Sequence, residues 1–386
     1  MKMARKIMLF GVLAFIAAPL FAAEDDSKAF EQFQGVIEGM NQHSFEMIKD
    51  AIDQTDLTNR VLSSQTLQAD VADGFRGNFW SVVESGVMGG LPPSGSDVKA
   101  ELISFEFQDG IGQACVRFSY PGYEYNFQVI DLRHDRRSRL KIVDWFDASK
   151  AQLFSAYLGE ELLGVKPTKE STRKLLSLSA PTDLQLFQAT EILKAIRDRQ
   201  APRFFEIYDE FDEQLRREPL IAKHALFSAN LVKDTARFVD SLKIFVDVYA
   251  DDPNFAFMLS DYYMIVQDYE NAFNSLRRFE QNFAVEEGAM PAKLSALALA
   301  IGKADEAEKF AVMATVNEPG LELGWWSLLR ARAGAEDYQG ALEPLQRLED
   351  DFGHRLDESK LRRDKFRAFA RLAGSQEFKD WRAGRN

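Results

Sequence analysis

Four residues in the N-terminal half carry side chains that could line a reactive pocket. Asp131 and Asp144 supply carboxyl groups, and Tyr125 and Trp145 supply large aromatic side chains. A carboxyl group whose pKa is strongly raised in such a pocket would be a candidate acid or base. The alternative is that Asp144 faces solvent from a strand and that Asp131 lies near a turn, where polar residues are common.

An alternating apolar and polar pattern predicts strands in the segment that carries these residues. Strands are expected at 103–107, 114–120, 123–129 and 140–146. Two amphipathic helices are expected before them, at 27–53 and 67–88. Helices followed by a meander predict an α+β domain over residues 24–165, with helices on one face of an antiparallel sheet. A curved sheet with helices across its mouth would enclose a pocket.

The order of these elements resembles the cone-shaped fold shared by nuclear transport factor two and ketosteroid isomerase. The resemblance covers roughly residues 30–166 and rests on element order and on the last strand, Leu140–Phe146, with its trailing segment. It implies a pocket in which an Asp or His does acid–base chemistry, and therefore an enzyme or a small-molecule carrier. A cystatin-like or plain curved sheet would give the same pattern, and a fold alone does not establish an activity.

Motifs of the common catalytic and cofactor sites are missing from the sequence. It contains no G-x4-G-K-[ST], H-E-x2-H, G-x-S-x-G or C-x2-C segment. The histidines are scattered and Cys115 is the only cysteine, so neither a zinc site nor an intramolecular disulfide is expected. Cys115 lies between two apolar residues of a strand, which favours an inert thiol. We therefore expect no cofactor, no metal and no catalytic residues.

The C-terminal half repeats with a period of 34 to 35 residues, marked by Ala272, Ala307 and Ala341. Apolar residues recur at fixed offsets before and after these alanines: Leu259, Leu294 and Leu328, then Leu276, Ala311 and Leu345. A period of this length predicts stacked helical hairpins. Small residues let the two helices of a hairpin approach closely, and large ones fill the gaps to the next hairpin.

This spacing resembles the tetratricopeptide repeat, whose pattern is W-x2-L-G-x2-Y, then A-x3-F, then A-x4-P. The resemblance covers residues 220–353 and departs from the pattern at Ser260, Ser295 and Leu329, where Gly or Ala is usual. An ordinary helical bundle with coincidental alanines is the alternative. The chain around the repeats is expected to form a linker at 166–182, a helix pair without the motif at 183–219, and capping helices at 354–386.

In the tetratricopeptide family, the first helix of each hairpin lines a concave groove that binds peptides or proteins. The resemblance implies that the groove positions here include Asn254, Phe257, Asp261, Trp326 and Arg330. Phe257 and Trp326 would be exposed anchors, because aromatic residues and Arg often anchor partners. Their alternative role is packing between hairpins. The resemblance thus implies a protein-binding scaffold, with self-association through the repeats as a further reading.

The N-terminus and the net charge indicate a compartment and exclude some partners. Residues 1–23 combine a charged start, an apolar run and Ala22-Ala23, which predicts a cleavable secretory signal peptide. The run is short for a membrane anchor, which needs about 20 residues. We expect a protein of the bacterial periplasm, with eukaryotic secretion as the alternative. A net charge of −13 argues against nucleic acid and anionic membranes as partners.

Overall fold

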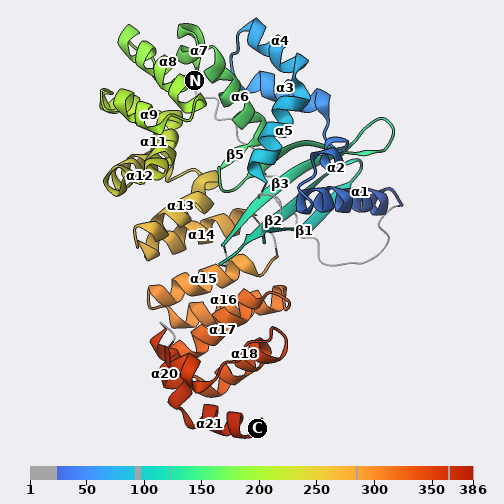
Figure 1. Cartoon of the computed structure of the whole chain (residues 1–386), viewed down its shortest axis with the longest axis vertical. Helices are drawn as coiled ribbons and strands as arrows, with labels where there is room; N and C mark the ends of the chain where they lie inside the picture. Colours follow the sequence, from blue (N-terminus) through green and yellow to red (C-terminus); the bar gives the residue numbers. More distant parts are fainter. Residues whose placement is uncertain (1–23, 92–96, 123, 284–285, 364–365, 386) are drawn as a thin grey trace. The chain divides into compact units, whose positions relative to one another are not determined.

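The computed structural model describes residues 24–91, 97–122, 124–283, 286–363 and 366–385. These residues form two compact units: the sheet unit, which ends at Met258, and the repeat unit, which begins at Leu259. Figure 1 shows the helices and strands of both units, with labels on most of them. The predicted signal peptide at 1–23 lies outside the described residues.

The sheet unit begins with helices α1 (Glu24–Asn41), α2 (Phe45–Lys49), α3 (Gln54–Ser64), α4 (Ala69–Gly77) and α5 (Phe79–Gly90). The two longer helices predicted at 27–53 and 67–88 are each divided. The first is interrupted at His43, whose φ of 52° lies in the left-handed region. The second is interrupted at Asn78, between α4 and α5. Helix α3 was not predicted; its N-cap is Asp53, whose side chain accepts a backbone hydrogen bond.

The sheet is an antiparallel meander in the order β1-β2-β3-β4-β5, which confirms the predicted topology. Its strands are β1 (Lys99–Gln108), β2 (Ile111–Tyr120), β3 (Glu124–His134), β4 (Leu140–Asp147) and β5 (Gln152–Leu153). Val116 lies opposite Gln128, and Phe118 lies opposite Asn126. Since side chains alternate along a strand, these polar residues share a face with the apolar side chains of β2. Both are buried, so the polar positions of β3 do not mark a solvent-facing side.

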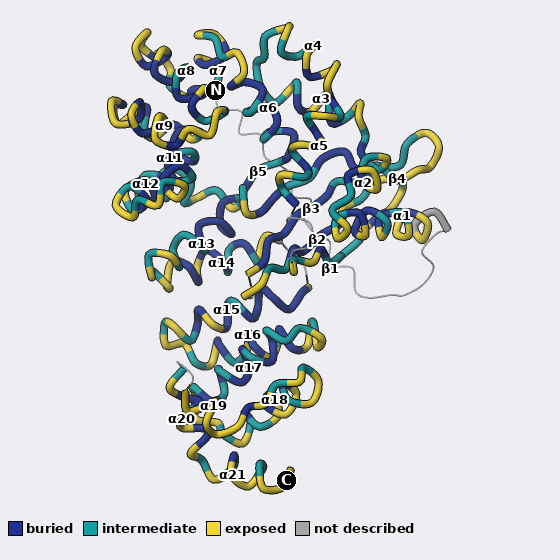
Figure 2. Tube along the Cα trace, viewed as in Figure 1, coloured by how far each residue is buried: buried dark blue, intermediate teal, exposed yellow. Residues whose placement is uncertain are grey.

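The hydrophobic core of this unit lies between one face of the sheet and the preceding helices. It includes Phe33 of α1, Phe79 and Val83 of α5, and Val116 and Ile130 of the sheet. Figure 2 shows buried residues along β2 and β3, the middle of the sheet. Burying each such side chain contributes about 1.5–3 kcal/mol to folding, so this layer fixes the position of the helices on the sheet.

Seven helices follow the sheet in the same unit: α6 (Phe154–Val165), α7 (Lys169–Leu175), α8 (Asp183–Arg197), α9 (Ala201–Tyr208), α10 (Glu213–Arg216), α11 (Pro219–Val232) and α12 (Thr235–Tyr249). Helix α7 lies within the predicted linker at 166–182 and starts with a capping box between Thr168 and Ser171. Helix α6 packs against α3, β4 and α8, and so connects the sheet to the helices that follow.

A buried ion pair joins α6 to α11. The Lys223 ammonium group donates to both carboxylate oxygens of Glu160, at 2.9 and 3.1 Å, and to Gln152 at 2.8 Å. Burial opposes ionisation of Glu160, but Lys223 and His224 outweigh it and lower the pKa of Glu160 to about 2. Burial lowers the pKa of His224, so this imidazole is neutral at pH 7. Lys223 is therefore the cation that compensates the buried carboxylate.

The remaining helices are α13 (Ala256–Ile265), α14 (Tyr269–Phe283), α15 (Ala289–Ala300), α16 (Ala304–Asn317), α17 (Glu322–Gly334), α18 (Tyr338–Asp350), α19 (Glu358–Arg363), α20 (Arg367–Gly374) and α21 (Gln376–Ala383). Within the repeat unit, α15 packs against α16 and α17, and α17 packs against α18 and α20. The marker residues Ala272, Ala307 and Ala341 are fully buried, as close helix packing requires.

The repeat is most regular in the turns inside the hairpins. Residues with left-handed φ recur at intervals of 34, 34, 35 and 34: Arg199, Lys233, Gln267, Gly302 and Glu336. After each of them, the next backbone N–H bonds to the carbonyl oxygen five residues earlier, at 2.8 to 3.4 Å. This bond is the mark of a Schellman motif, which ends a helix. The period thus begins at α8–α9, although residues 183–219 carry no sequence motif.

The Gly302→Ala variant is expected to lower the free energy of unfolding of the repeat unit by about 1–2 kcal/mol. Its φ of 77° is unfavourable for a residue with a Cβ, although the space around a Cβ there is open. Urea unfolding followed by circular dichroism measures the change. Gly320→Ala is the control, because Gly320 is outside the left-handed region and also has open space. Equal effects of the two substitutions would contradict the assignment.

The Lys223→Met variant is expected to destabilise the sheet unit by about 3–5 kcal/mol, because Glu160 would be left buried without a counter-ion. The double variant Lys223→Met/Glu160→Gln should recover much of this loss. The pKa of Glu160 is lowered from 4.5 to about 2, so the stabilisation is complete above about pH 4.5 and falls as the pH drops towards 2. When urea unfolding is measured at pH 7, 5 and 3, the free energy of unfolding of wild type should therefore approach that of the double variant as the pH falls. A constant difference across this range would contradict the account.

Candidate functional site

The four residues predicted to share a pocket are not brought together. Trp145 lies opposite Ile130 on the helix-covered face of the sheet and lines a pocket there. Tyr125 and Asp131 occupy the other set of alternating positions on β3, and so belong to the opposite face. Tyr125 is buried next to Phe127 and Phe257, with ring centroids 5.4 and 6.1 Å away. The pocket prediction is therefore wrong for Tyr125 and Asp131.

Asp144 is fully buried and caps helix α6. Its Oδ1 accepts hydrogen bonds from the backbone N–H groups of Ser155 and Trp145, both at 3.0 Å, and its Oδ2 accepts from the Ser155 hydroxyl at 2.6 Å. Burial raises the pKa of Asp144, while these bonds and Arg60 act in the opposite direction. The α6 N-cap, Leu153, provides no side-chain bond of its own. Asp144 thus satisfies the helix terminus from a neighbouring strand and does not face the pocket.

A β-bulge explains why Asp144 and Trp145 have these positions. The register shifts by one residue in β4, so that Leu132 pairs with Ile142 while Asp131 pairs with Asp144. The bulge brings Ile142 and Trp145, three residues apart, onto the same face. Strict alternation, which the sequence pattern assumes, would separate them.

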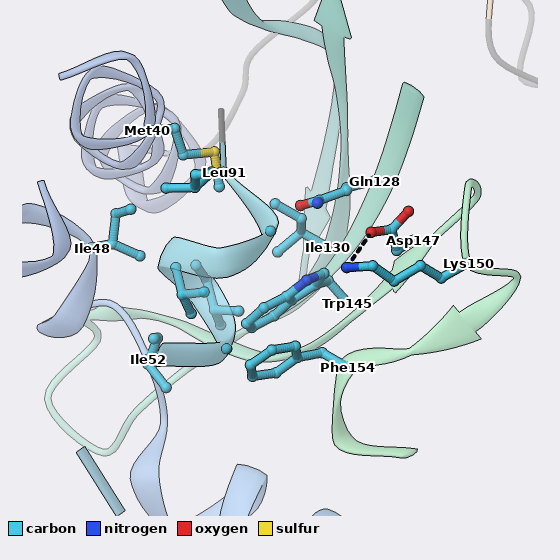
Figure 3. Close-up of a pocket in the computed structure, with 14 residues that line it drawn as sticks. Met40, Ile48, Ile52, Leu91, Gln128, Ile130, Trp145, Asp147, Lys150 and Phe154 are labelled. Atoms are coloured by element: carbon cyan, nitrogen blue, oxygen red, sulfur yellow. Dashed lines mark ion pairs between the residues drawn. The ribbon is translucent and has the colours of Figure 1, made fainter. Parts of the chain in front are cut away.

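The pocket lies between the sheet and helices α1, α2, α5 and α6 (Figure 3). Its apolar wall includes Ile48, Leu91, Ile130 and Phe154. Trp145 stacks on Phe154 with ring centroids 3.9 Å apart, which closes one side. The space open to the centres of water-sized molecules is about 30 Å³, enough for about two waters. Known ligand pockets of drug size are about 300–1,000 Å³, so a large ligand does not fit here.

Polar residues line the sheet side of this pocket. The Asp147 carboxylate accepts hydrogen bonds from the side chain of Asn126 at 3.0 Å and from the hydroxyl of Ser149 at 2.7 Å. The Lys150 ammonium group lies 3.2 Å from Asp147 and 5.4 Å from the centre of the Tyr157 ring. Lys150 is about 40% exposed and reaches over the pocket, as Figure 3 shows. The sequence pattern did not identify these residues, because Gln128 and Asn126 occupy positions that alternate with aromatic side chains.

The predicted groove residues fall in both units. Asn254 and Phe257 belong to the sheet unit, whereas Asp261, Trp326 and Arg330 belong to the repeat unit. Phe257 is 1% exposed because it packs on Tyr125 and Phe127, so it is not an exposed anchor. The structure places Asn254 in a short 3-10 helix, with its N–H bonded to Asp252.

Trp326 is partly buried against the C-terminal helices of the repeat unit. Its ring lies 5.3 Å from His354 and 6.3 Å from Phe369 of α20, and its indole N–H donates to Glu322 at 2.9 Å. The Arg330 guanidinium group stacks 5.8 Å from the same ring. Trp326 therefore has the packing role that was the alternative to an anchor, and Arg330 covers its outer side.

Six residues on the first helices of the repeat unit are at least partly exposed; we call them the first-helix surface. It comprises Asp261, Lys293, Ala296, Ala300, Trp326 and Arg330. Asp261 forms an ion pair with Lys293, which links α13 to α15. Ala296 and Ala300 follow Lys293 at three and seven residues, so they share its side of α15, and both are exposed.

No protein-family model and no curated protein matches the chain. Among solved structures, parts of the chain are similar to MamA. MamA from Desulfovibrio magneticus RS-1 is 10% identical, and the match covers 44% of this chain and 96% of that chain with a TM-score of 0.34. MamA of MSR-1 is 16% identical, over 44% of this chain and 98% of that chain, with a TM-score of 0.34. Similarity this distant assigns no function. The proposed function therefore rests on the residues of this chain.

In the part of the chain that the structure describes, no helix is long and apolar enough to cross a membrane. Within the same residues, no three His, Cys, Asp or Glu side chains are grouped closely enough to hold a metal ion.

The Asp144→Ala variant is expected to lower the free energy of unfolding of the sheet unit by about 2–3 kcal/mol, because buried donors at the start of α6 lose their acceptor. The Asp131→Ala variant removes a partly exposed carboxylate on the same face and should change it by less than about 1 kcal/mol. Urea unfolding compares the two. Similar effects would mean that Asp144 is not the α6 cap.

Proposed function

We propose that the protein is a non-enzymatic scaffold of the bacterial periplasm that binds a peptide segment of a partner protein on the first-helix surface. The main support is the hairpin turn that recurs every 34 or 35 residues, since repeated hairpins leave one helix of each pair available along an open surface. Small exposed residues on α15 would allow a peptide backbone to lie close to the helix.

Charge defines the expected partner more narrowly. Arg330 has no carboxylate partner among the described residues, and its helix, α17, packs against α15, which carries Ala296 and Ala300. Lys293 is already compensated by Asp261. We therefore expect the bound segment to direct an acidic side chain towards Arg330, which can bind a carboxylate with two hydrogen bonds.

The periplasmic location is supported by the sequence of residues 1–23, which has the charge and apolar pattern of a secretory signal. Cell fractionation of the source bacterium, with the protein detected by antibody, tests this part of the proposal. Recovery in the cytoplasmic fraction alone would contradict it.

The Ala300→Arg variant of the full-length protein is expected to lose its partner, because a long charged side chain would block the first-helix surface. Ala300 is exposed, so the substitution should leave the fold intact. Cross-linking in a periplasmic extract followed by affinity capture and mass spectrometry measures the partners of each form.

Val316→Arg is the matched control, because Val316 is 70% exposed on α16, which is a second helix of a hairpin. Partners captured by wild type and Val316→Arg but not by Ala300→Arg would support the proposal. Capture that is the same for all three forms, or absent from wild type, would contradict binding at this surface.

A further inference from the structure

We infer that acid opens the contact between α6 and α11, because opening lets His224 take up a proton that the closed contact excludes. The contact joins Glu160 of α6 and Gln152 of β5 to Lys223 and His224 of α11. All four residues belong to the sheet unit. The inference depends neither on the proposed scaffold function nor on the location of the protein.

His224 lies beside a carboxylate whose charge is already compensated. Its Nε2 atom is buried and has no hydrogen-bond partner among the described residues. This atom is 3.9 Å from Oε2 of Glu160, which is too far for a hydrogen bond. Lys223 donates to the same oxygen at 2.9 Å and to the other carboxylate oxygen at 3.1 Å. A proton on the imidazole would therefore place a second cation against a single carboxylate.

The balance of influences on His224 favours the neutral imidazole. Burial is the largest of them and lowers the pKa of His224, Glu160 raises it, and Lys223 lowers it further. The next carboxylate of α6, Glu161, interacts with Arg199. The closed contact therefore excludes a proton from His224 at a pH where a hydrated histidine would bind one.

The other helices that pack against α11 carry ionisable groups with partners of their own. From α12, the Tyr249 hydroxyl donates to the Pro219 carbonyl oxygen at 2.6 Å, and burial raises its pKa, so it is uncharged. Further groups on these helices or beside them pair elsewhere: Asp209 with Arg237, Arg216 with the Tyr208 ring, Arg217 with Asp247, Tyr157 with Arg199, and Glu218 with the backbone of Ser177. A protonated His224 would have to share Glu160 with Lys223.

The contact is also incompletely hydrogen-bonded. The side-chain nitrogen of Gln152 is buried and, like Nε2 of His224, has no partner in the described part of the chain. Water that enters on opening would bond to both nitrogen atoms, which lowers the free-energy cost of opening. Because Asp144 fixes α6 to β4, the part that separates is α11 with its hairpin partner α12.

The pH range follows from the two states of His224. In the open, hydrated state its pKa is about 6.5, and in the closed state the pKa is lower. Glu160 stays ionised throughout, because its pKa is about 2. The contact is therefore most stable above about pH 6.5, and below it opening takes up one proton. The ratio of open to closed molecules should rise by up to about ten-fold per pH unit, until the closed-state pKa is reached.

The test is hydrogen exchange of the full-length protein between pH 7.5 and 5.5, measured by mass spectrometry on peptides that cover α11. Rates divided by the intrinsic exchange rate at each pH report the ratio of open to closed molecules. In wild type this ratio should rise by up to about ten-fold between pH 6.5 and 5.5. His224→Gln should lose the rise, because glutamine takes up no proton.

His354→Gln is the control, because His354 belongs to the repeat unit and lies 2.8 Å from Glu322. It should keep the rise in α11. His224→Phe replaces His224→Gln if circular dichroism shows the latter to be unfolded. An assigned imidazole titration of folded wild type by nuclear magnetic resonance gives a second measurement, in which His224 should have a midpoint below 6.5. A rise that survives loss of His224, no rise in wild type, or a His224 midpoint at or above 6.5 would each overturn the inference.

Discussion

The bond between Asp144 and the N-terminus of α6 is the constraint on which the sheet unit depends. It fixes the helix to β4, and the same helix then carries Phe154 into the pocket wall and Glu160 towards Lys223. The Asp144 carboxylate therefore helps to position both Phe154 in the pocket wall and Glu160 beside Lys223. Its burial raises its pKa, but this shift reports a structural role and not an acid that faces a substrate. Buried structural groups also have shifted pKa values, so a raised pKa by itself does not mark a functional residue.

The repeats show how much of the helical structure a local sequence pattern can predict. The buried alanines identified three hairpins correctly, because close helix packing demands a small residue at one position. The earlier hairpins were harder to recognise, since their period is preserved in backbone conformation and not in residue type. Of the residues in the left-handed turn positions, only Gly302 is of a type that favours this conformation. Arg199 and Lys233 adopt it under the Schellman hydrogen bonds, which no composition signal reveals.

The strands were predictable from the alternation of apolar and polar residues, but the face of the sheet on which each side chain lies was not. The turn at Pro121-Gly122 sets the register between β2 and β3. In this register Gln128 lies opposite Val116, on the apolar face of the sheet. The position of Trp145 depends on a bulge, and the burial of Phe257 depends on a contact with Phe127 across a long stretch of chain. Both are tertiary effects that override a strict period of two. Candidate sites inferred from residue type and spacing failed mainly at these points.

The join between α6 and α11 also bears on how such a protein can evolve. Repeat arrays commonly gain or lose hairpins by duplication and exchange, because each hairpin depends mainly on its neighbours. Here the hairpin formed by α11 and α12 contributes Lys223 to a carboxylate of the sheet unit, and α13 contributes Phe257 to the sheet. These early hairpins are tied to a non-repeating domain and cannot be exchanged without it. Recombination that preserves folding is thereby restricted to the hairpins that follow, so the sheet and the early hairpins are inherited together.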